Sequence, residues 1–263
     1  MNLKQRVFED YLKPSRLPLY QQILELALLN NYEMMSELSF YKLITAGDID
    51  GRKILVNRHD IDTSPKVASK MFEIEKKVYG KNGSSTYYFR LSTIDRELIK
   101  MIDSFGYETG YHYEELATLE KKTKTKSKEG MMGQKSEAEQ QFLKNLGYFR
   151  RFTGSPSISV ASHGDFINTK YKIQNAVLLE NEMVRNKGNI LFEAYDPIVN
   201  TPIEKRFADQ VLLAEFAPQV IDAIKDGVSV IMLLTHPRNW QVDFFANTKD
   251  NAKRLIEGTI YRL

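Results

Sequence analysis

The sequence contains no cysteine, so it can form neither disulfides nor thiolate metal sites, and it offers no cysteine nucleophile. No segment approaches the ~18 apolar residues that a membrane-spanning helix requires. The net charge is only +3, and no long basic run is interleaved with aromatic residues, which argues against nucleic-acid binding. Residues 1–10 carry acids where a secretory signal needs an apolar core, so we expect a cytoplasmic protein.

The overall composition is typical of a globular protein, with 42% hydrophobic and 27% charged residues. The 263 residues suffice for one large domain, and we predict a single domain over 1–263. Apolar residues at helical spacing predict an N-terminal helical cap over 1–48. The polar, lysine-rich stretch 117–136 predicts a mobile, solvated insert, with a grip on an anionic ligand as the alternative.

From residue 52 onward, short apolar runs alternate with amphipathic helical patterns. The expected strands cover 53–57, 86–91, a short run ending at His112, 158–161, 190–194 and 228–234. Repeated alternation of strand and helix predicts a parallel sheet or barrel.

Each of the four histidines lies at the end of a strand-like run. They are His59, His112, His163 and His236. The carboxyl ends of parallel strands converge on one edge of a sheet or barrel, which is where such folds carry their chemistry. Imidazole is the commonest metal ligand and the usual acid or base near neutral pH. The pattern therefore predicts one shared site.

The motif His59-Asp60-Ile61-Asp62 supplies two carboxylates to that site. Residues two apart in an extended strand point the same way, so Asp60 and Asp62 can reach one point. One carboxylate can then hold a metal while the other takes a proton from metal-bound water. The alternative is structural: Asp62 caps the following helix and Asp60 pairs with Arg58.

Two further histidines are candidate metal ligands. His112 is followed by Glu114 and Glu115, either of which could add an oxygen; a buried histidine bonded to backbone is the alternative. His163 precedes a glycine on a turn open to ligand, and Asp165 could orient its imidazole instead of binding. A turn histidine bonded to local backbone is the alternative there.

The fourth histidine, His236, follows the most apolar run of the chain and could serve as a general acid. Trp240, the only tryptophan, lies close to it in sequence and could stack on a sugar ring. Packing in the core is the alternative role for this tryptophan.

In the order of these blocks, the stretch Ile54–Trp240 resembles the polysaccharide deacetylase superfamily, of the NodB-homology or carbohydrate-esterase-4 type. The match is to a divergent intracellular branch. The resemblance implies an α/β fold, a distorted (β/α) barrel of about seven parallel strands, beneath the helical cap. It also implies a divalent metal, usually zinc, and the removal of acetyl groups from N-acetylated sugars.

By that resemblance Asp60 would be the catalytic base, Asp62 a metal ligand, and His236 the acid that protonates the leaving amine. The family's arginine motif is only faintly similar to Arg150-Arg151, and we assign those residues no catalytic role.

The family's metal motif is the point at which the sequence departs. His112 matches its first histidine, but Leu116 occupies the position of the second. The third ligand must then come from elsewhere, and we favour His163 over Glu114 or Glu115.

The motifs predict a metal-dependent hydrolase with a metal-bound water as nucleophile, and the resemblance implies that it removes an acetyl group from an N-acetylated sugar or glycan precursor. Zinc would be held by Asp62, His112 and His163, because nitrogen and oxygen ligands suit that metal. We assign four residues to substrate binding: His59, Tyr113, Asp165 and Trp240. The alternatives are a non-catalytic deacetylase-like sugar-binding protein and another metal-dependent hydrolase, such as a phosphoesterase.

Overall fold

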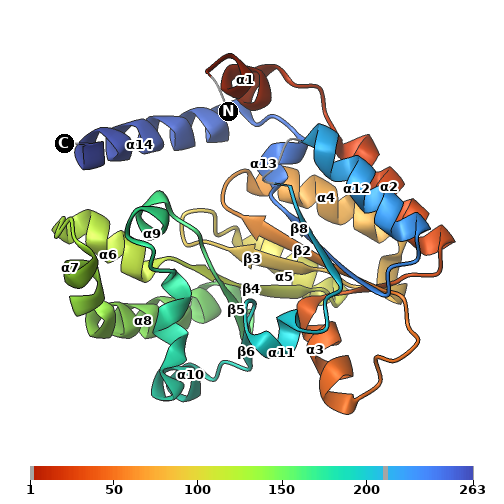
Figure 1. The fold of residues 1–263 in the computed structure, drawn as a ribbon, viewed down its shortest axis with the longest axis horizontal. Helices are drawn as coiled ribbons and strands as arrows, with labels where there is room; N and C mark the ends of the chain where they lie inside the picture. Colours follow the sequence, from red (N-terminus) through yellow and green to blue (C-terminus); the bar gives the residue numbers. More distant parts are fainter. Residues whose placement is uncertain (1–2, 210–212, 263) are drawn as a thin grey trace.

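The computed structural model describes residues 3–209 and 213–262. Its centre is a curled parallel sheet with the strand order β6-β5-β4-β3-β2-β8-β7 (Figure 1). These seven strands curl through 203° as a half-barrel, which confirms the distorted (β/α) barrel. An additional short strand, β1 (Glu33–Met35), pairs with β2 outside this order. The seven strands are β2 (Ile54–Ile61), β3 (Thr86–Phe89), β4 (Glu108–Tyr113), β5 (Ser159–Ser162), β6 (Phe192–Glu193), β7 (Lys205–Ala208) and β8 (Val230–Thr235).

Strand β2 is the centre of this sheet because it pairs with neighbouring strands on both edges. One edge pairs with β8. The other edge is shared: β1 pairs with residues 54–56, and β3 pairs with residues 58–61. Every residue of β2 is buried. This is expected for a central strand of a parallel sheet that is covered on both faces.

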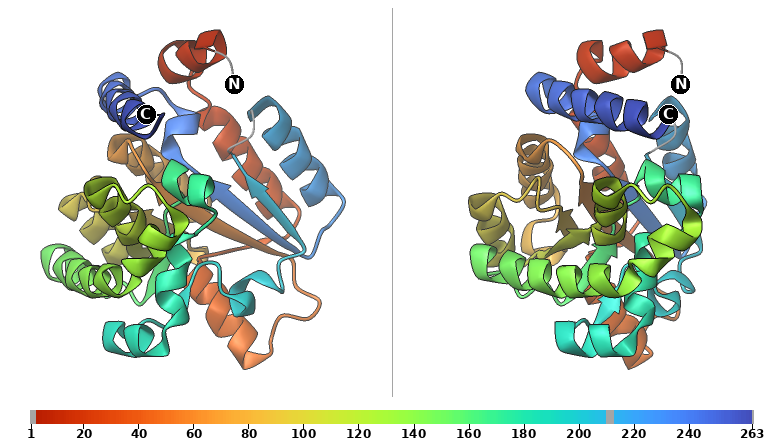
Figure 2. Two further views of the ribbon diagram at one scale, coloured as in Figure 1. Left: turned by 60° about the vertical axis from the view of Figure 1, so that its left-hand side comes forward. Right: turned by 90° about the vertical axis from the view of Figure 1, so that its left-hand side faces the viewer.

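Helices surround the sheet on its outer face and at its ends (Figure 2). They are α1 (Leu3–Val7), η1 (Phe8–Leu12), α2 (Leu17–Leu29), α3 (Glu37–Ala46), α4 (Pro65–Val78), η2 (Gly80–Asn82), α5 (Arg96–Phe105), α6 (Glu115–Thr123), α7 (Lys128–Gly133), α8 (Lys135–Thr153), α9 (Phe166–Tyr171), η3 (Asn175–Glu180), α10 (Glu182–Gly188), α11 (Pro197–Asn200), α12 (Leu213–Lys225), α13 (Pro237–Trp240) and α14 (Phe244–Arg262). The large apolar core lies between the outer face of the sheet and helices such as α2, α4, α5 and α12. Among the described residues, no helix has the length and apolar character needed to cross a membrane.

Helix α3 closes the N-terminal end of the half-barrel. Phe40 on this helix packs with Ile54, Val56 and Met232, which point from β2 and β8 into the interior. The helix begins at Ser36, whose side chain accepts from the Ser39 backbone N–H, and it ends before a left-handed glycine. Because α3 covers the N-terminal end, a functional site is expected at the opposite end, where the strands have their carboxyl ends.

Two predicted segments differ from the structure. The stretch 117–136, predicted as a mobile insert, is mostly helical: it holds the greater part of α6 and all of α7, and Met131 is fully buried. The acid Glu120, also buried, explains the order, because it accepts hydrogen bonds from Thr125 and from the backbone of Lys126. The segment 1–48, predicted as a helical cap, also contains the strand β1, which pairs with β2 of the main sheet.

Candidate metal centre

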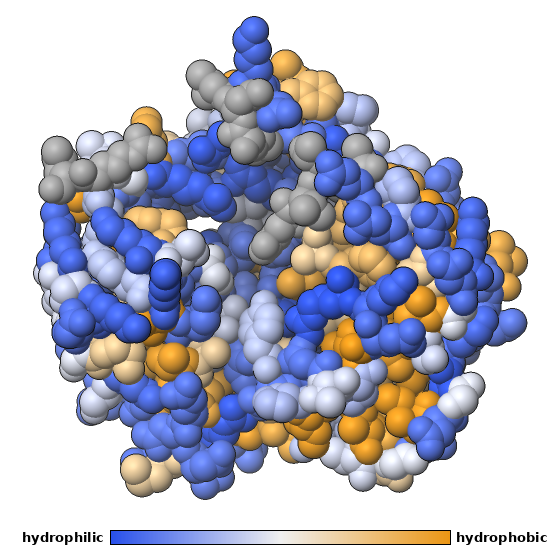
Figure 3. Space-filling model, in the orientation of Figure 1, coloured by the Kyte–Doolittle hydropathy of each residue, from blue (hydrophilic) through white to orange (hydrophobic). Residues whose placement is uncertain are grey.

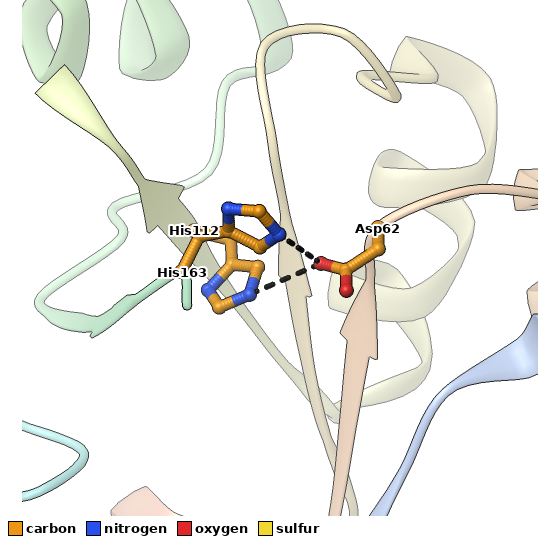
Figure 4. Close-up of side chains that lie close together, drawn as sticks. All are labelled: Asp62, His112 and His163. Carbon is orange, nitrogen blue, oxygen red and sulfur yellow. Dashed lines mark ion pairs between the residues drawn. The ribbon is translucent and has the colours of Figure 1, made fainter. Parts of the chain in front are cut away.

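Three side chains meet at the carboxyl ends of β2, β4 and β5 (Figure 4). Asp62 lies one residue beyond β2, His112 lies near the end of β4, and His163 lies one residue beyond β5. Asp62 Oδ1 is 3.3 Å from His112 Nε2 and 3.4 Å from His163 Nε2. The candidate ligand atoms of all three residues lie within 4.8 Å of one another. The parallel sheet thus gathers one oxygen and two nitrogen donors at one point.

The donor set fits a divalent metal. The Oδ1 atom of Asp62 is buried and has no hydrogen-bond partner, although burying a carboxylate oxygen without a partner is costly. Two imidazoles and one carboxylate with an open side are a donor set that zinc accepts in catalytic sites. The open side is present, because Asp62 and His163 both line a cleft.

The tautomer of His112 is set by its backbone partner. Its Nδ1 lies 3.0 Å from the carbonyl oxygen of Ala161 on the neighbouring strand β5. A carbonyl can only accept, so Nδ1 carries a proton, and Nε2 is the ring atom that faces Asp62. This is how a metal-binding histidine is usually oriented.

His163 is oriented by charge from the opposite side. Its Nδ1 is 3.3 Å from Glu114 Oε2, and Glu114 is held in turn by a two-pronged ion pair with Arg90. Burial lowers the pKa of His163, but Asp62 and Glu114 outweigh it and raise the pKa to about 9. Burial likewise raises the pKa of Asp62, but His163 and His112 bring it well below its usual range. The Asp62 carboxylate is therefore ionised.

Asp60 lies beside the three donors and is paired with an arginine. Both of its oxygens accept from Arg58, at 2.8 Å and 2.9 Å, and Oδ2 is 3.6 Å from His112 Nε2. Burial raises the pKa of Asp60, but the Arg58 guanidinium outweighs it and lowers the pKa overall. Arg58 itself is fully buried and also contacts Tyr195. The pairing of Asp60 with Arg58, which the sequence left as an alternative role, is present.

His236 approaches the same point from β8. Its Nδ1 is 2.7 Å from Asp209 Oδ1, and its Nε2 is 4.0 Å from Asp62 Oδ2. Asp209 follows β7 and also accepts from the backbone N–H of His236 and from the indole N–H of Trp240. Burial lowers the pKa of His236, but the Asp209 carboxylate outweighs it and raises the pKa to about 9.

These groups form the floor of a cleft of about 620 Å³. Asp60, Asp62, His163, Asp209 and His236 all line it, and its walls come from η1, α9 and the helix α14. Figure 3 shows the molecule hollowed beneath α14. The remaining lining is rich in paired charges, so the cleft is polar and suits a hydroxyl-rich or charged ligand.

No protein-family model matches this chain, and no curated protein sequence matches it. Two solved structures are similar. One is the peptidoglycan deacetylase PdaC from Bacillus subtilis, with 15% sequence identity over 78% of this chain and 96% of that one. The other is a point mutant of the same deacetylase, with 14% identity over 79% of this chain and 98% of that one. The TM-score is 0.33 in both comparisons.

The sequence-predicted residues divide into two groups. Asp60, Asp62, His112, His163 and His236 lie together at the site. Asp165 lies at the rim of the cleft, where it caps α9 and forms a 2.6 Å ion pair with Lys121.

The other three predicted substrate-binding residues are fully buried in the core. His59 faces away from Asp60 and bonds Glu75 and Thr235, each at 2.6 Å. Tyr113 packs on Phe142, and Trp240 packs on Tyr20. His59 and Tyr113 are therefore core residues, and core packing, the alternative given for Trp240, is what the structure has.

The two glutamates near His112 lie in different places. Glu114 contacts His163 and stays near the site, whereas Glu115 accepts from Tyr111 and Asn145 and points into the core. Leu116 is fully buried. The position where the resemblance places a second histidine therefore faces the core.

Sequence reasoning missed Asp209, and it gave the pairing of Arg58 with Asp60 only as an alternative. Asp209 follows β7, a strand whose first residues Lys205 and Arg206 are exposed, so no apolar run marked it. Arg58 was visible as the residue two before Asp60 in one strand, which places both side chains on one face.

Proposed function

We propose that this protein is a metal-dependent hydrolase that removes an acetyl group from an N-acetylated sugar. The observation that carries the proposal is the juxtaposition of three donors, Asp62, His112 and His163, with a second carboxylate and a further imidazole. Asp60 and His236 flank the donors, and Asp60, Asp62, His163 and His236 line one polar cleft. Amide hydrolysis needs this combination of a base, an acid and an electrophile.

The three donors would hold the metal, which we propose to be zinc. When bound, the metal would polarise the acetyl carbonyl and lower the pKa of the attacking water. Glu114 and the Ala161 carbonyl would keep the two imidazole rings in place, through the contacts they make to His163 and His112.

Asp60 would accept the proton that the attacking water loses. Its Oδ2 faces the donor group, and Arg58 fixes its orientation through two hydrogen bonds. The same arginine keeps the carboxylate ionised at neutral pH, and it also makes Asp60 a weaker base. Arg58 therefore helps Asp60 by fixing its position and keeping it ionised, not by making it a stronger base. The bound metal would lower the pKa of the water enough for Asp60 to accept its proton.

His236 would protonate the departing amine. Asp209 accepts from Nδ1–H, so Nε2–H points to the site, and the raised pKa keeps the second proton on the ring at neutral pH. The proton count balances: the Asp60 carboxylate gains one proton from water, the His236 imidazolium loses one to nitrogen, and acetic acid and a free amine leave.

Metal content is the first test. Elemental analysis of purified protein should find about one zinc per chain, and His112→Ala and His163→Ala should each lose it. Asp50→Asn, at an exposed position, is the matched control and should retain it. Loss in His112→Ala with retention in His163→Ala would move the third ligand to Glu114. No metal after reconstitution would favour a non-catalytic sugar-binding protein.

Acetate release from N-acetylglucosamine oligosaccharides is the second test. Asp60→Asn should abolish turnover and leave the metal bound, because Asn keeps the shape but accepts no proton. Loss of metal in Asp60→Asn would instead make Asp60 a ligand. Phosphate release from a generic phosphomonoester, without acetate release, would contradict the deacetylase and favour a phosphoesterase.

A further inference from the structure

A polar network lies in the core on the outer face of β2, opposite the metal centre. The carboxylate of Glu75 on α4 accepts hydrogen bonds from the side chains of Tyr20, Asn57, His59 and Tyr87, and all five residues are fully buried. Burial raises the pKa of Glu75, but His59 outweighs it and lowers the pKa overall, so the carboxylate is ionised. Apolar side chains of similar volume are often as stable as a buried ionic group, so stability alone does not account for this network.

His59 links this network to the neighbouring strand β8 (Figure 1). Its Nε2 is 2.6 Å from Glu75 Oε1, and its Nδ1 is 2.6 Å from Thr235 Oγ1. His59 and Thr235 are direct partners in the parallel pairing of β2 with β8, and Thr235 is also fully buried. The bond therefore joins the two strands side chain to side chain, close to their carboxyl ends.

The next residue on each of the two strands is one of the groups proposed to transfer protons. Asp60 follows His59, and His236 follows Thr235 with its backbone still extended, at φ −121° and ψ 119°. Successive side chains of an extended chain point to opposite faces. Asp60 and His236 therefore face the site because His59 and Thr235 face the core. A fixed distance between the two core side chains constrains the distance between the two groups on the inner face.

Trp240 connects the same network to His236 by a second route. Its ring packs against that of Tyr20, with 5.2 Å between the ring centroids, and its indole N–H donates to Asp209 Oδ2. The other oxygen of Asp209 is the partner of the His236 imidazole. The buried network thus also supports the group that orients His236.

We propose that His59 and Thr235 are positioning residues, which hold the ends of β2 and β8, and with them Asp60 and His236, at a fixed separation. Catalysis is sensitive to such positions: a displacement of about 1 Å, caused by a substitution away from the reacting atoms, can lower a rate by about a hundredfold. A network with a structural role alone would affect stability and leave catalysis unchanged. The catalytic part of the inference rests on the proposed deacetylase function, whereas the junction of the two strand ends does not.

The variant Thr235→Val removes the bond to His59 and keeps the shape of the side chain. In acetate release from N-acetylglucosamine oligosaccharides, it should lower kcat by about tenfold or more, with KM and metal content unchanged. Thr235→Ser keeps the hydroxyl and should restore most of the wild-type kcat. The matched control is Thr153→Val on α8, because Thr153 is also buried and its hydroxyl donates to the Phe149 carbonyl, away from the site. This control should leave kcat unchanged.

Hydrogen exchange measured by mass spectrometry tests the junction without any need for turnover. In Thr235→Val, the backbone amides at the ends of β2 and β8 should exchange about tenfold faster than in the wild type, with β4 and β5 unchanged. Thr235→Ser and Thr153→Val should exchange there as the wild type does. Unchanged exchange at the two strand ends, or an equal rise across the whole sheet, would overturn the proposal, whether or not the protein releases acetate. If the wild type releases acetate, an unchanged kcat in Thr235→Val would overturn it as well. A wild type that releases no acetate would contradict the deacetylase function, and exchange alone would then decide whether the junction exists.

Discussion

Glu37 should make the protein less stable as the pH rises towards 7. This glutamate is fully buried inside the half-barrel, accepts a 2.7 Å hydrogen bond from the Tyr88 hydroxyl and lies 3.4 Å from Arg58. Burial raises the pKa of Glu37 from 4.5 to about 7, against the opposing effect of Arg58, and repulsion from Glu108 adds to the rise. The folded protein therefore holds a proton there that the unfolded chain releases near its ordinary pKa.

The sign of the effect follows from that difference. Between the two pKa values the folded state binds more protons than the unfolded state, so the free energy of unfolding falls as the pH rises. The contribution is fully present below 4.5 and is lost above about 7. A pKa that moves from 4.5 to about 7 corresponds to about 3 kcal/mol.

The variant Glu37→Gln isolates this contribution. Glutamine keeps an oxygen that accepts from Tyr88 but does not titrate. Urea unfolding at several pH values between about 4 and about 8 should show the wild type losing about 3 kcal/mol relative to the variant. The exposed substitution Glu97→Gln should leave the pH dependence unchanged. Parallel curves for wild type and Glu37→Gln would refute the reasoning.

Three further results are expected. Arg58→Met leaves Asp60 buried without its partner and should lower the free energy of unfolding by about 3–5 kcal/mol in urea, whereas a change below about 1 kcal/mol would contradict a buried pair. Zinc at about a hundredfold excess over its Kd should raise the free energy of unfolding by about 3 kcal/mol, a chelator should reverse the rise, and His163→Ala should not respond. Asp209→Asn should lower kcat by about a hundredfold or more with the metal retained, because His236 loses the group that orients and charges it; an unchanged kcat would exclude His236 as the acid.

The strongly patterned elements were predictable from sequence. The helix expected over 95–105 is α5, which begins after Asp95, whose side chain accepts from the Leu98 backbone, and ends before Gly106 at φ 97°. The strand expected over 228–234 is β8, because its apolar run is long and buried on both faces. By contrast, β6 has two residues and β7 is partly exposed, so neither carries a pattern strong enough to bound it.

The partners of the site residues were harder to predict than the residues themselves. His112 and His163 could be proposed from their places at strand ends. The contacts that orient them come from other strands: Ala161, which His112 contacts, belongs to β5, and Glu114, which His163 contacts, follows β4. Asp209 reaches His236 only because β7 pairs with β8. Such contacts depend on strand order, which a single sequence does not contain.

The prediction that His59 binds substrate could have been avoided from the sequence alone. The strand β2 runs to Ile61, so side chains alternate through the whole motif. Asp60 and Asp62 can share a face only if His59 points to the opposite one, where Glu75 of α4 receives it. The period-two rule that paired the two aspartates therefore already excluded His59 from their site. Strand alternation is thus a stricter guide to which side chains can meet than the position of a residue near a strand end.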